Sequence, residues 1–115
     1  EGNDIVAFNQ FAIAYRDKYP VVPMHTLIIP KRHCQDVFEL DSHELKAMHD
    51  LSKKIKDQDQ EQDPSIEGFN IGYNSGEVAG QTVFHCHMHL IPRRHGDVSN
   101  PIGGVRNIIA GKGSY

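Results

Sequence analysis

The chain lacks several features that mark common protein classes. No segment approaches the roughly 20 continuous apolar residues that a membrane-spanning helix needs, so we expect no membrane association. The net charge is -3, whereas general nucleic-acid-binding domains carry a basic excess, so we expect no nucleic-acid partner. Repeats are also missing from the 115 residues, a length that is sufficient for a hydrophobic core. We therefore expect one domain over residues 1–115.

Cysteine is scarce and carries no motif. Cys34 and Cys86 do not form a C-x-x-C pair, and the alternation around Cys86 turns it toward a core. Two cysteines of this kind are typical of reduced thiols in a reducing compartment. The first ten residues show no secretory signal. We therefore expect a cytoplasmic protein, and what precedes Glu1 stays open.

The most unusual segment of the chain, residues 81–94, contains three histidines at a spacing of two. His85, His87 and His89 alternate with apolar residues, which predicts a β-strand with the imidazoles on one face. The apolar residues expected on the other face are Phe84, Cys86, Met88 and Leu90. Imidazole is costly to bury without partners and titrates near neutrality, so three on one face indicate chemistry rather than packing.

Two kinds of chemistry could use these imidazoles. In a straight strand His85 and His89 would lie roughly 13 Å apart, too far to share one metal ion without outside ligands. No second motif of acidic or cysteine ligands is evident, so a metal site is the less favoured alternative and we expect none. The other chemistry is nucleophilic attack by His87, with its two neighbours about 7 Å away at the backbone to relay protons. Attack of nitrogen on phosphorus suits this arrangement.

The first half of the chain predicts a hairpin, a further strand and a helix. Apolar runs at residues 4–8 and 11–16 flank a turn, and residues 20–23 should be extended but not central to a sheet because of their prolines. Residues 25–30 form a strand rich in branched side chains. An aspartate cap followed by apolar residues at helical spacing predicts a helix over residues 42–58.

The second half predicts less regular structure. The polar run at residues 57–64 indicates a frayed helix end and a loop. Residues 69–74 alternate as a strand, which a tight glycine-bearing turn should connect to the histidine strand. Residues 95–115 are rich in glycine and should form a loop-rich arm. Cations gather at residues 31–33 and 93–95, a pattern that fits a small anionic ligand.

The segment His85-Cys86-His87-Met88-His89-Leu90-Ile91 resembles the H-φ-H-φ-H-φ-φ signature, where φ is an apolar residue, of the histidine triad (HIT) family of nucleotide hydrolases and transferases. Similar segments occur in that family at residues 15–17, 22–33, 74 and 80–82, so the resemblance covers most of the chain. It implies an α+β fold with a mainly antiparallel sheet of about five strands, one long helix and a shorter helical segment. It also implies a homodimer.

The resemblance further implies roles for individual residues. His87 would attack the α-phosphorus and hold the nucleotidyl group covalently, His85 and His89 would aid phosphate binding and proton transfer, and His25 would orient the triad. The nucleotide-binding residues would be Asp17 at the ribose, Asn74 and Gln81 at the phosphates, and Thr82 near the leaving group. Side chains near Phe11, Ile13 and Leu27 would enclose the base.

The expected activity is hydrolysis of an adenine dinucleoside polyphosphate at its α-phosphate, with release of a nucleoside monophosphate. His89 stands where galactose-1-phosphate uridylyltransferases carry glutamine, and histidine can protonate a leaving group. The alternatives are hydrolysis of adenosine 5'-phosphoramidate and nucleotide binding without turnover. The covalent step requires no cofactor, although a divalent ion such as Mg²⁺ can accompany the polyphosphate. Met24 replaces a glycine that is usual in the family. The N-terminal segment that carries zinc-binding cysteines in some members is absent here, so we expect no structural zinc.

Overall fold

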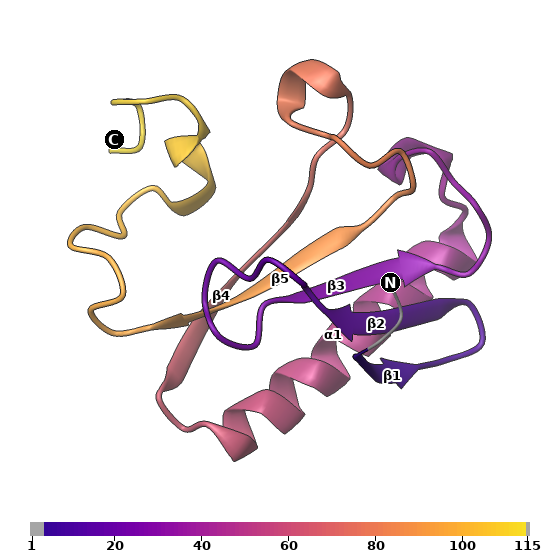
Figure 1. Cartoon of the computed structure of the whole chain (residues 1–115), viewed down its shortest axis with the longest axis horizontal. Helices are drawn as coiled ribbons and strands as arrows, with labels where there is room; N and C mark the ends of the chain where they lie inside the picture. The colour runs from indigo at the N-terminus through magenta and orange to yellow at the C-terminus, as the bar shows by residue number, and fades with distance from the viewer. Residues whose placement is uncertain (1–3, 115) are drawn as a thin grey trace.

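The strands of the computed structural model, which describes residues 4–114, form one antiparallel sheet in the order β1-β2-β3-β5-β4 (Figure 1). The strands are β1 (Ile5–Phe8), β2 (Ala12–Arg16), β3 (Thr26–Pro30), β4 (Ile66–Tyr73) and β5 (Met88–Arg94). The helices are α1 (Ser42–Gln62) and the short 3-10 helices η1 (Val37–Glu39), η2 (Glu77–Ala79) and η3 (Gly104–Ile108). The predicted α+β fold, with about five strands and one long helix, is therefore confirmed.

The hydrophobic core lies between one face of the sheet and α1. Ala12, Ala14 and Ile28 alternate with less buried residues along β2 and β3 and are inaccessible to solvent. The residues of α1 that complete this core are Ala47, Met48, Leu51 and Ile55. Because side chains of a strand alternate between faces, the odd-numbered residues of β2 and β3 are left on the opposite face of the sheet. That face has no helix packed on it in Figure 1 within the described residues.

Helix α1 begins as the sequence predicts and ends later. The side chain of Asp41 accepts from the backbone of Glu44, whose own side chain accepts from the Asp41 N–H, which completes a capping box. The predicted end at residue 58 was wrong, since the helix continues to Gln62. Asp59 is buried and accepts two hydrogen bonds of 2.9 Å from the Arg16 guanidinium, so a tertiary ion pair extends the helix into the polar run. No helix described in residues 4–114 is long and apolar enough to cross a membrane.

The hairpin of β1 and β2 and the strand β3 are confirmed, whereas residues 20–23 form bends and a turn rather than the extended segment predicted. The chain then turns at Met24, which has φ +73 and is the one non-glycine residue with positive φ in the described chain. Such a conformation is unfavourable for residues with a Cβ atom and favours glycine, the residue that the family resemblance implies at this position. The Met24 carbonyl accepts hydrogen bonds from Arg16 and Thr26, and these bonds hold the turn.

The histidine segment differs from the predicted strand, because β5 begins only at Met88. Before this residue the Cys86 N–H donates to the Cys34 carbonyl at 2.7 Å, so the backbone bonds to the segment after β3 rather than to a strand. His85 and His87 therefore precede the strand, and only His89 is part of it. The prediction that the apolar residues between the histidines face the core is confirmed for Cys86, Met88 and Leu90. It is wrong for Phe84, which is exposed.

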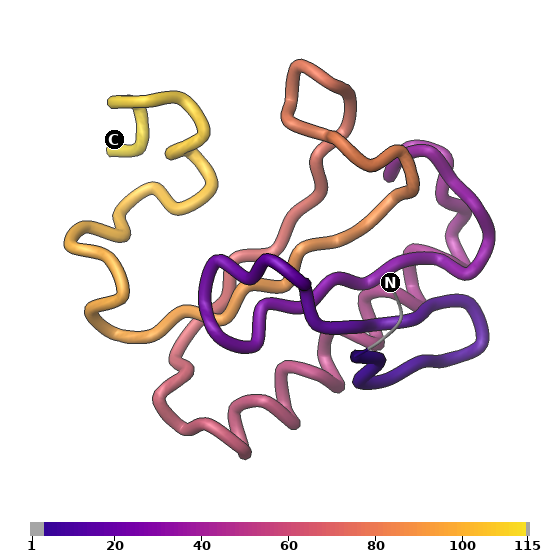
Figure 2. Tube along the Cα trace, viewed as in Figure 1, coloured from indigo at the N-terminus to yellow at the C-terminus, as the bar shows by residue number. Residues whose placement is uncertain are grey.

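The connection from β4 to β5 is also longer than predicted. Residues 74–87 form an extended excursion that contains η2 and projects from the sheet in Figure 2, rather than a tight turn. After β5, residues 95–114 contain η3 and otherwise no helix or strand, and they lead away from the sheet (yellow in Figure 2). The loop-rich character predicted for the arm is confirmed for these residues, and Tyr115 lies outside the described range. The single domain over residues 1–115 stays a prediction.

Candidate active site

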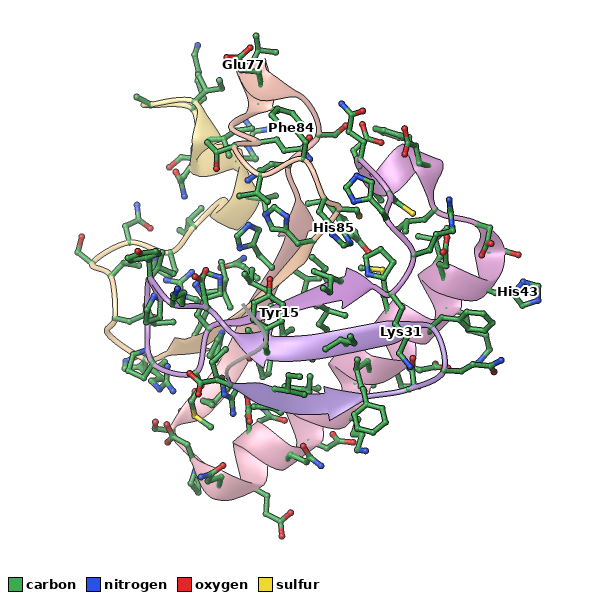
Figure 3. The ribbon with its side chains drawn as sticks, turned by 45° about the vertical axis from the view of Figure 1, so that its right-hand side comes forward. Tyr15, Lys31, His43, Glu77, Phe84 and His85 are labelled. Carbon is green, nitrogen blue, oxygen red and sulfur yellow. The ribbon has the colours of Figure 1, made fainter. Side chains whose placement is uncertain are left out.

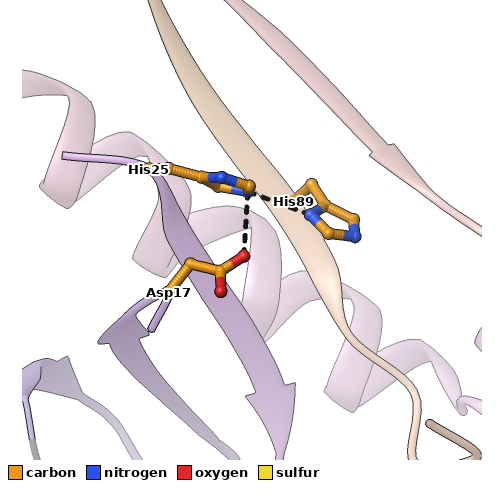
Figure 4. Close-up of side chains that lie close together, drawn as sticks. All are labelled: Asp17, His25 and His89. Atoms are coloured by element: carbon orange, nitrogen blue, oxygen red, sulfur yellow. Dashed lines mark hydrogen bonds and ion pairs between the residues drawn. The ribbon is translucent and has the colours of Figure 1, made fainter. Parts of the chain in front are cut away.

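Strand pairing brings His25 and His89 together although 64 positions separate them in the sequence. His89 of β5 lies opposite Leu27 of β3, and His25 immediately precedes β3. The Nε2 atom of His25 lies 3.0 Å from Nδ1 of His89 (Figure 4). The Val21 N–H donates to His25 Nδ1 at 3.2 Å, so in neutral His25 the proton is on Nε2. His25 Nε2 therefore donates to His89 Nδ1, which leaves the proton of neutral His89 on Nε2.

His87 is held in the opposite tautomer. Its Nδ1 atom lies 2.9 Å from the carbonyl oxygen of His85, and because a carbonyl only accepts, Nδ1 carries the proton and donates it. The lone pair of neutral His87 is then on Nε2. The rings of His87 and His89 lie edge to face, with 5.1 Å between their centroids. A nucleophilic nitrogen and an N–H donor are thus neighbours in one site.

His85 contributes to the site chiefly by fixing the backbone. Its Nε2 donates to the Pro30 carbonyl at the end of β3, at 3.2 Å. The ring also contacts the ring of His33 edge to face, at 5.0 Å between centroids, a contact that no sequence signal indicated. Since the carbonyl of His85 holds His87, these anchors determine where the His87 ring lies.

Burial sets the charge of the His25–His89 pair. It lowers the pKa of His25, and the negative charge of Asp17 opposes this effect in part. The pKa of His89 is lowered by burial first and then by the neighbouring His87 and His25, again against Asp17. Both rings are therefore neutral at neutral pH, which agrees with the donor chain from Val21 through His25 to His89.

Asp17 lies beside this pair at the end of β2. Its Oδ2 atom is 3.5 Å from His25 Nε2, while Oδ1 accepts from the Tyr19 N–H at 2.9 Å. The ligand atoms of Asp17, His25 and His89 lie within 4.8 Å of one another, a grouping that could hold a metal ion. His25, however, turns a protonated nitrogen toward the group, and that nitrogen has no lone pair for a metal. The three residues thus fit a hydrogen-bond chain better than a metal centre, and the expected absence of a metal stays a prediction.

An apolar cavity of about 370 Å³ adjoins the triad on the face of the sheet opposite α1. Its lining residues are Ile5, Ile13, Tyr15, Leu27, Ile29, Val83, His85 and His87. Figure 3 shows Tyr15 and His85 on this side of the sheet. Ile13 and Leu27 were expected here and line the cavity, whereas Phe11 does not. Tyr15 and Ile29 were missed, although their odd numbering, shared with Ile13 and Leu27, could have identified them.

None of the four expected nucleotide-binding residues, Asp17 included, lines this cavity. Asn74 and Thr82 are exposed on the excursion between β4 and β5. Gln81 is buried, and its side chain is bonded within the excursion and to the segment after β3. The Gln81 amide donates to the carbonyls of Gln35 and Val83 at 2.7 and 3.1 Å, and its oxygen accepts from the Gly76 N–H. Their roles toward a nucleotide stay predictions.

A second cavity, of about 400 Å³, lies between the arm and the β4–β5 side of the sheet. Its charged residues are Arg93 and Asp97, which bond each other at 2.8 Å. Asn70 accepts from Arg93 at 2.7 Å in the same cavity. The charge of this cavity is therefore compensated internally, unlike the site around the triad.

The cysteines next to the triad are poor nucleophiles. Cys34 and Cys86 are both free and buried. Burial raises the pKa of Cys86 to about 12 and also raises the pKa of Cys34. Both are therefore protonated at neutral pH, so the nitrogen of His87 is the better candidate nucleophile.

Comparisons with known proteins give one family. Residues 2–96 match the HIT domain family. An uncharacterised HIT-like protein of Mycoplasma genitalium is 43% identical over 86 residues, which are 74% of this chain and 60% of that protein. An asymmetrical bis(5'-nucleosyl)-tetraphosphatase of Schizosaccharomyces pombe is 34% identical over 98 residues, 85% of this chain and 53% of that protein. The crystal structure of a HIT family protein from Bacillus anthracis has a TM-score of 0.75 at 40% identity, and covers 79% of this chain and 64% of that one.

The chain spans 60% of the length of the Mycoplasma genitalium protein and 53% of the length of the tetraphosphatase. The match nevertheless extends across all five strands and α1, and it includes the triad and the histidine before β3. Sequence signature, strand order and relatives agree, and the chain belongs to the histidine triad (HIT) family.

Proposed function

We propose that this chain hydrolyses an adenine dinucleoside polyphosphate at its α-phosphate, through a covalent nucleotidyl group on His87. The observation that carries the proposal is the pair of tautomers in the site. His87 is oriented with its Nε2 lone pair free, while the neighbouring His89 has its proton on Nε2. A nucleophile and a hydrogen-bond donor for the departing group are what nucleotidyl transfer requires.

In the first step the Nε2 atom of His87 attacks the α-phosphorus. A nitrogen–phosphorus bond forms, and the bond from the α-phosphorus to the bridging oxygen breaks. The Nε2–H of His89 donates a hydrogen bond to the departing phosphate, which leaves as an anion and needs no proton. The Nδ1–H of His87 continues to donate to the His85 carbonyl, which stabilises the positive charge on the nucleotidyl-histidine.

In the second step a water molecule attacks the same phosphorus atom from the side that the polyphosphate has left. The nitrogen–phosphorus bond breaks, and its electron pair returns to Nε2 of His87. The products are a nucleoside monophosphate and one proton, which is released to solvent. The second half-reaction thus restores the neutral tautomer of His87.

The substrate class is supported by the cavity and by one relative. The cavity of about 370 Å³ has aliphatic residues and Tyr15 beside the triad, a lining that suits a nucleobase. The relative from Schizosaccharomyces pombe is named as an asymmetrical bis(5'-nucleosyl)-tetraphosphatase, which is an activity of the proposed type. We propose further that a divalent ion accompanies the polyphosphate rather than residing in the protein, and that the enzyme acts in the cytoplasm as a homodimer. The Nε2–H of His89 also favours adenosine 5'-phosphoramidate as the second candidate substrate, since its amine must leave with a proton.

The test is a substrate panel with a covalent trap. Purified protein is given diadenosine polyphosphates and adenosine 5'-phosphoramidate, and products are separated by chromatography. Rapid base quenching, which spares the acid-labile nitrogen–phosphorus bond, followed by mass spectrometry should find one AMP group on His87. His87→Ala should lose at least about 10⁴-fold in kcat/KM because no other nitrogen can replace the nucleophile.

Two controls make the result specific. His49→Ala removes an exposed histidine of α1 far from the triad and should leave the rate unchanged. Treatment with a strong chelator, without added metal, should also preserve activity on the phosphoramidate. Binding of AMP without cleavage of any substrate would instead establish a nucleotide-binding module, and loss of phosphoramidate cleavage on chelation would establish a metal enzyme.

A further inference from the structure

The proton between His25 and His89 has two acceptors. His25 Nε2 lies 3.0 Å from His89 Nδ1 and 3.5 Å from Oδ2 of Asp17 (Figure 4). The pair is enclosed, since His25 is buried and Asp17 and His89 are only partly accessible. A carboxylate this close to a buried imidazole interacts strongly with any charge on it.

We propose that Asp17 is a positioning residue that acts through His25, and that it stabilises the protonated His25–His89 pair needed to expel an amine leaving group. The inference rests on the proposed function and deepens it, because it assigns the cleavage of phosphoramidates to one carboxylate. It differs from a contact with the ribose, the role that the family resemblance implies for this residue.

The two leaving groups place different demands on the pair. A polyphosphate departs as an anion, and a hydrogen bond from neutral His89 suffices. An amine departs only after it has gained a proton: as the bond from His87 Nε2 to phosphorus forms, the phosphorus–nitrogen bond of the substrate breaks, and a proton moves from His89 Nε2 to the amine. For that transfer the pair must begin with one extra proton, and it ends neutral.

The surroundings oppose this extra proton, and Asp17 favours it. Burial disfavours a charge on either ring, and His87 acts in the same sense on His89. The Val21 N–H, which points at His25 Nδ1, also disfavours a proton there. On the β4 side the residue paired with His89 is Gly72, which brings no charge.

Tyr15, whose hydroxyl group the charge of Asp17 also affects, adds no charge either. Burial and the negative charge of Asp17 raise the Tyr15 pKa, so its hydroxyl stays neutral. Asp17 is therefore the carboxylate in the described cluster that compensates a positive charge on the pair.

The first arm of the test is an NMR titration of His25 and His89 without substrate. Asp17→Asn keeps the size of the side chain and removes its charge, so the pKa values of both rings should fall below those of the wild type. Asp17→Glu should restore them in part. The matched control is Asp36→Asn, which removes a carboxylate that also accepts a backbone N–H, at Phe38, but lies at η1. It should leave both titrations unchanged.

The second arm compares leaving groups. Asp17→Asn should lower kcat for adenosine 5'-phosphoramidate about tenfold more than kcat for a diadenosine polyphosphate, as a partial loss of general acid catalysis. It should also move the descending limb of the phosphoramidate pH profile to lower pH. The same difference should persist with 2'-deoxyadenosine substrates, which lack the hydroxyl that a ribose contact would use.

Three results would overturn the proposal. Unchanged histidine titrations in Asp17→Asn would show that the carboxylate does not act on the pair. An equal loss for both leaving groups that disappears with deoxy substrates would establish a ribose contact. A lower melting temperature without a change in the titrations would show that Asp17 only stabilises the fold, through its hydrogen bond from the Tyr19 N–H. If no substrate is cleaved, the proposed function fails, and the titration still decides whether Asp17 controls the charge of the pair.

Discussion

Ile28 and Ile29 are neighbours in β3, yet they serve opposite faces of the same sheet. Ile28 is inaccessible to solvent and packs in the core against α1, whereas Ile29 is half-buried and lines the cavity beside the triad. The two preceding residues repeat this division, with Thr26 buried and Leu27 in the cavity. One strand thus supplies stability with its even-numbered residues and a binding surface with its odd-numbered residues.

The polar groups of the two faces differ in the same way. On the helix side, Arg16 and Asp59 pair at 2.9 Å, and Arg32 pairs with Glu44 at 2.8 Å, so charge is neutralised in place. On the open side the histidines are linked by hydrogen bonds that leave one nitrogen of His87 free. Paired charges secure the fold, while neutral rings that keep a free nitrogen can react.

The largest effect is expected on the helix side. Ile28→Ala creates a cavity in the closed core and should reduce the free energy of unfolding by about 3 kcal/mol, while Ile28→Val should cost about 1 kcal/mol. Denaturant titration measures both. The KM of the protein that remains folded should match the wild type, because Ile28 does not line the cavity. A raised KM for Ile28→Ala would break the separation between the two faces.

The neighbouring substitution should act mainly on binding. Ile29→Ala removes apolar contact from the cavity, and a loss of about 1 kcal/mol of transfer free energy corresponds to a KM about fivefold higher. Its unfolding free energy should fall by only about 1 kcal/mol, since Ile29 is already partly exposed. Steady-state kinetics beside denaturant titration separates the two effects, and a loss of stability as large as that of Ile28→Ala would contradict the comparison.

The smallest effect concerns a charge on the helix side. The hydrogen bond from Arg32, with help from the Asp41 N–H, lowers the pKa of Glu44, so its ionised form stabilises the fold above the unfolded value of about 4.3. Glu44→Gln keeps the capping acceptor and loses the charge, which should cost about 1 kcal/mol at neutral pH because Arg32 is half-exposed. That difference should vanish as pH falls through the folded pKa. Unfolding of both proteins at several pH values tests this, and a constant difference would exclude Glu44 as its source.

Much of the fold follows from local patterns. The capping box of Asp41 and Glu44 and the alternation in β2 and β3 are short-range signals, and the helix start, the hairpin and β3 were all predicted from them. The end of α1 was missed because the ion pair of Asp59 with Arg16 joins residues 43 positions apart. The start of β5 was missed for a similar reason: the Cys86 N–H donates to the Cys34 carbonyl and therefore forms no hydrogen bond to a neighbouring strand.

The site shows the same limit. The histidine spacing indicated His87 as a nucleophile with two helpers, but it placed all three rings on one strand and could not indicate their tautomers. The structure differentiates them through partners that periodicity cannot indicate: Val21 for His25, His25 for His89, and the His85 carbonyl for His87. Gln81 shows the converse case, because internal hydrogen bonds take up the side chain that the resemblance assigned to a phosphate.

The sequence by itself determined the family, the class of fold and the histidines proposed to react, because signatures, caps and alternation are properties of neighbouring residues. Tertiary structure alone decided which nitrogen of each ring carries the proton, and it brought Asp17 and His25 to His89. An imidazole tautomer depends on the donor or acceptor that each nitrogen meets, and in this protein strand pairing supplies the partner of His89 from 64 positions away.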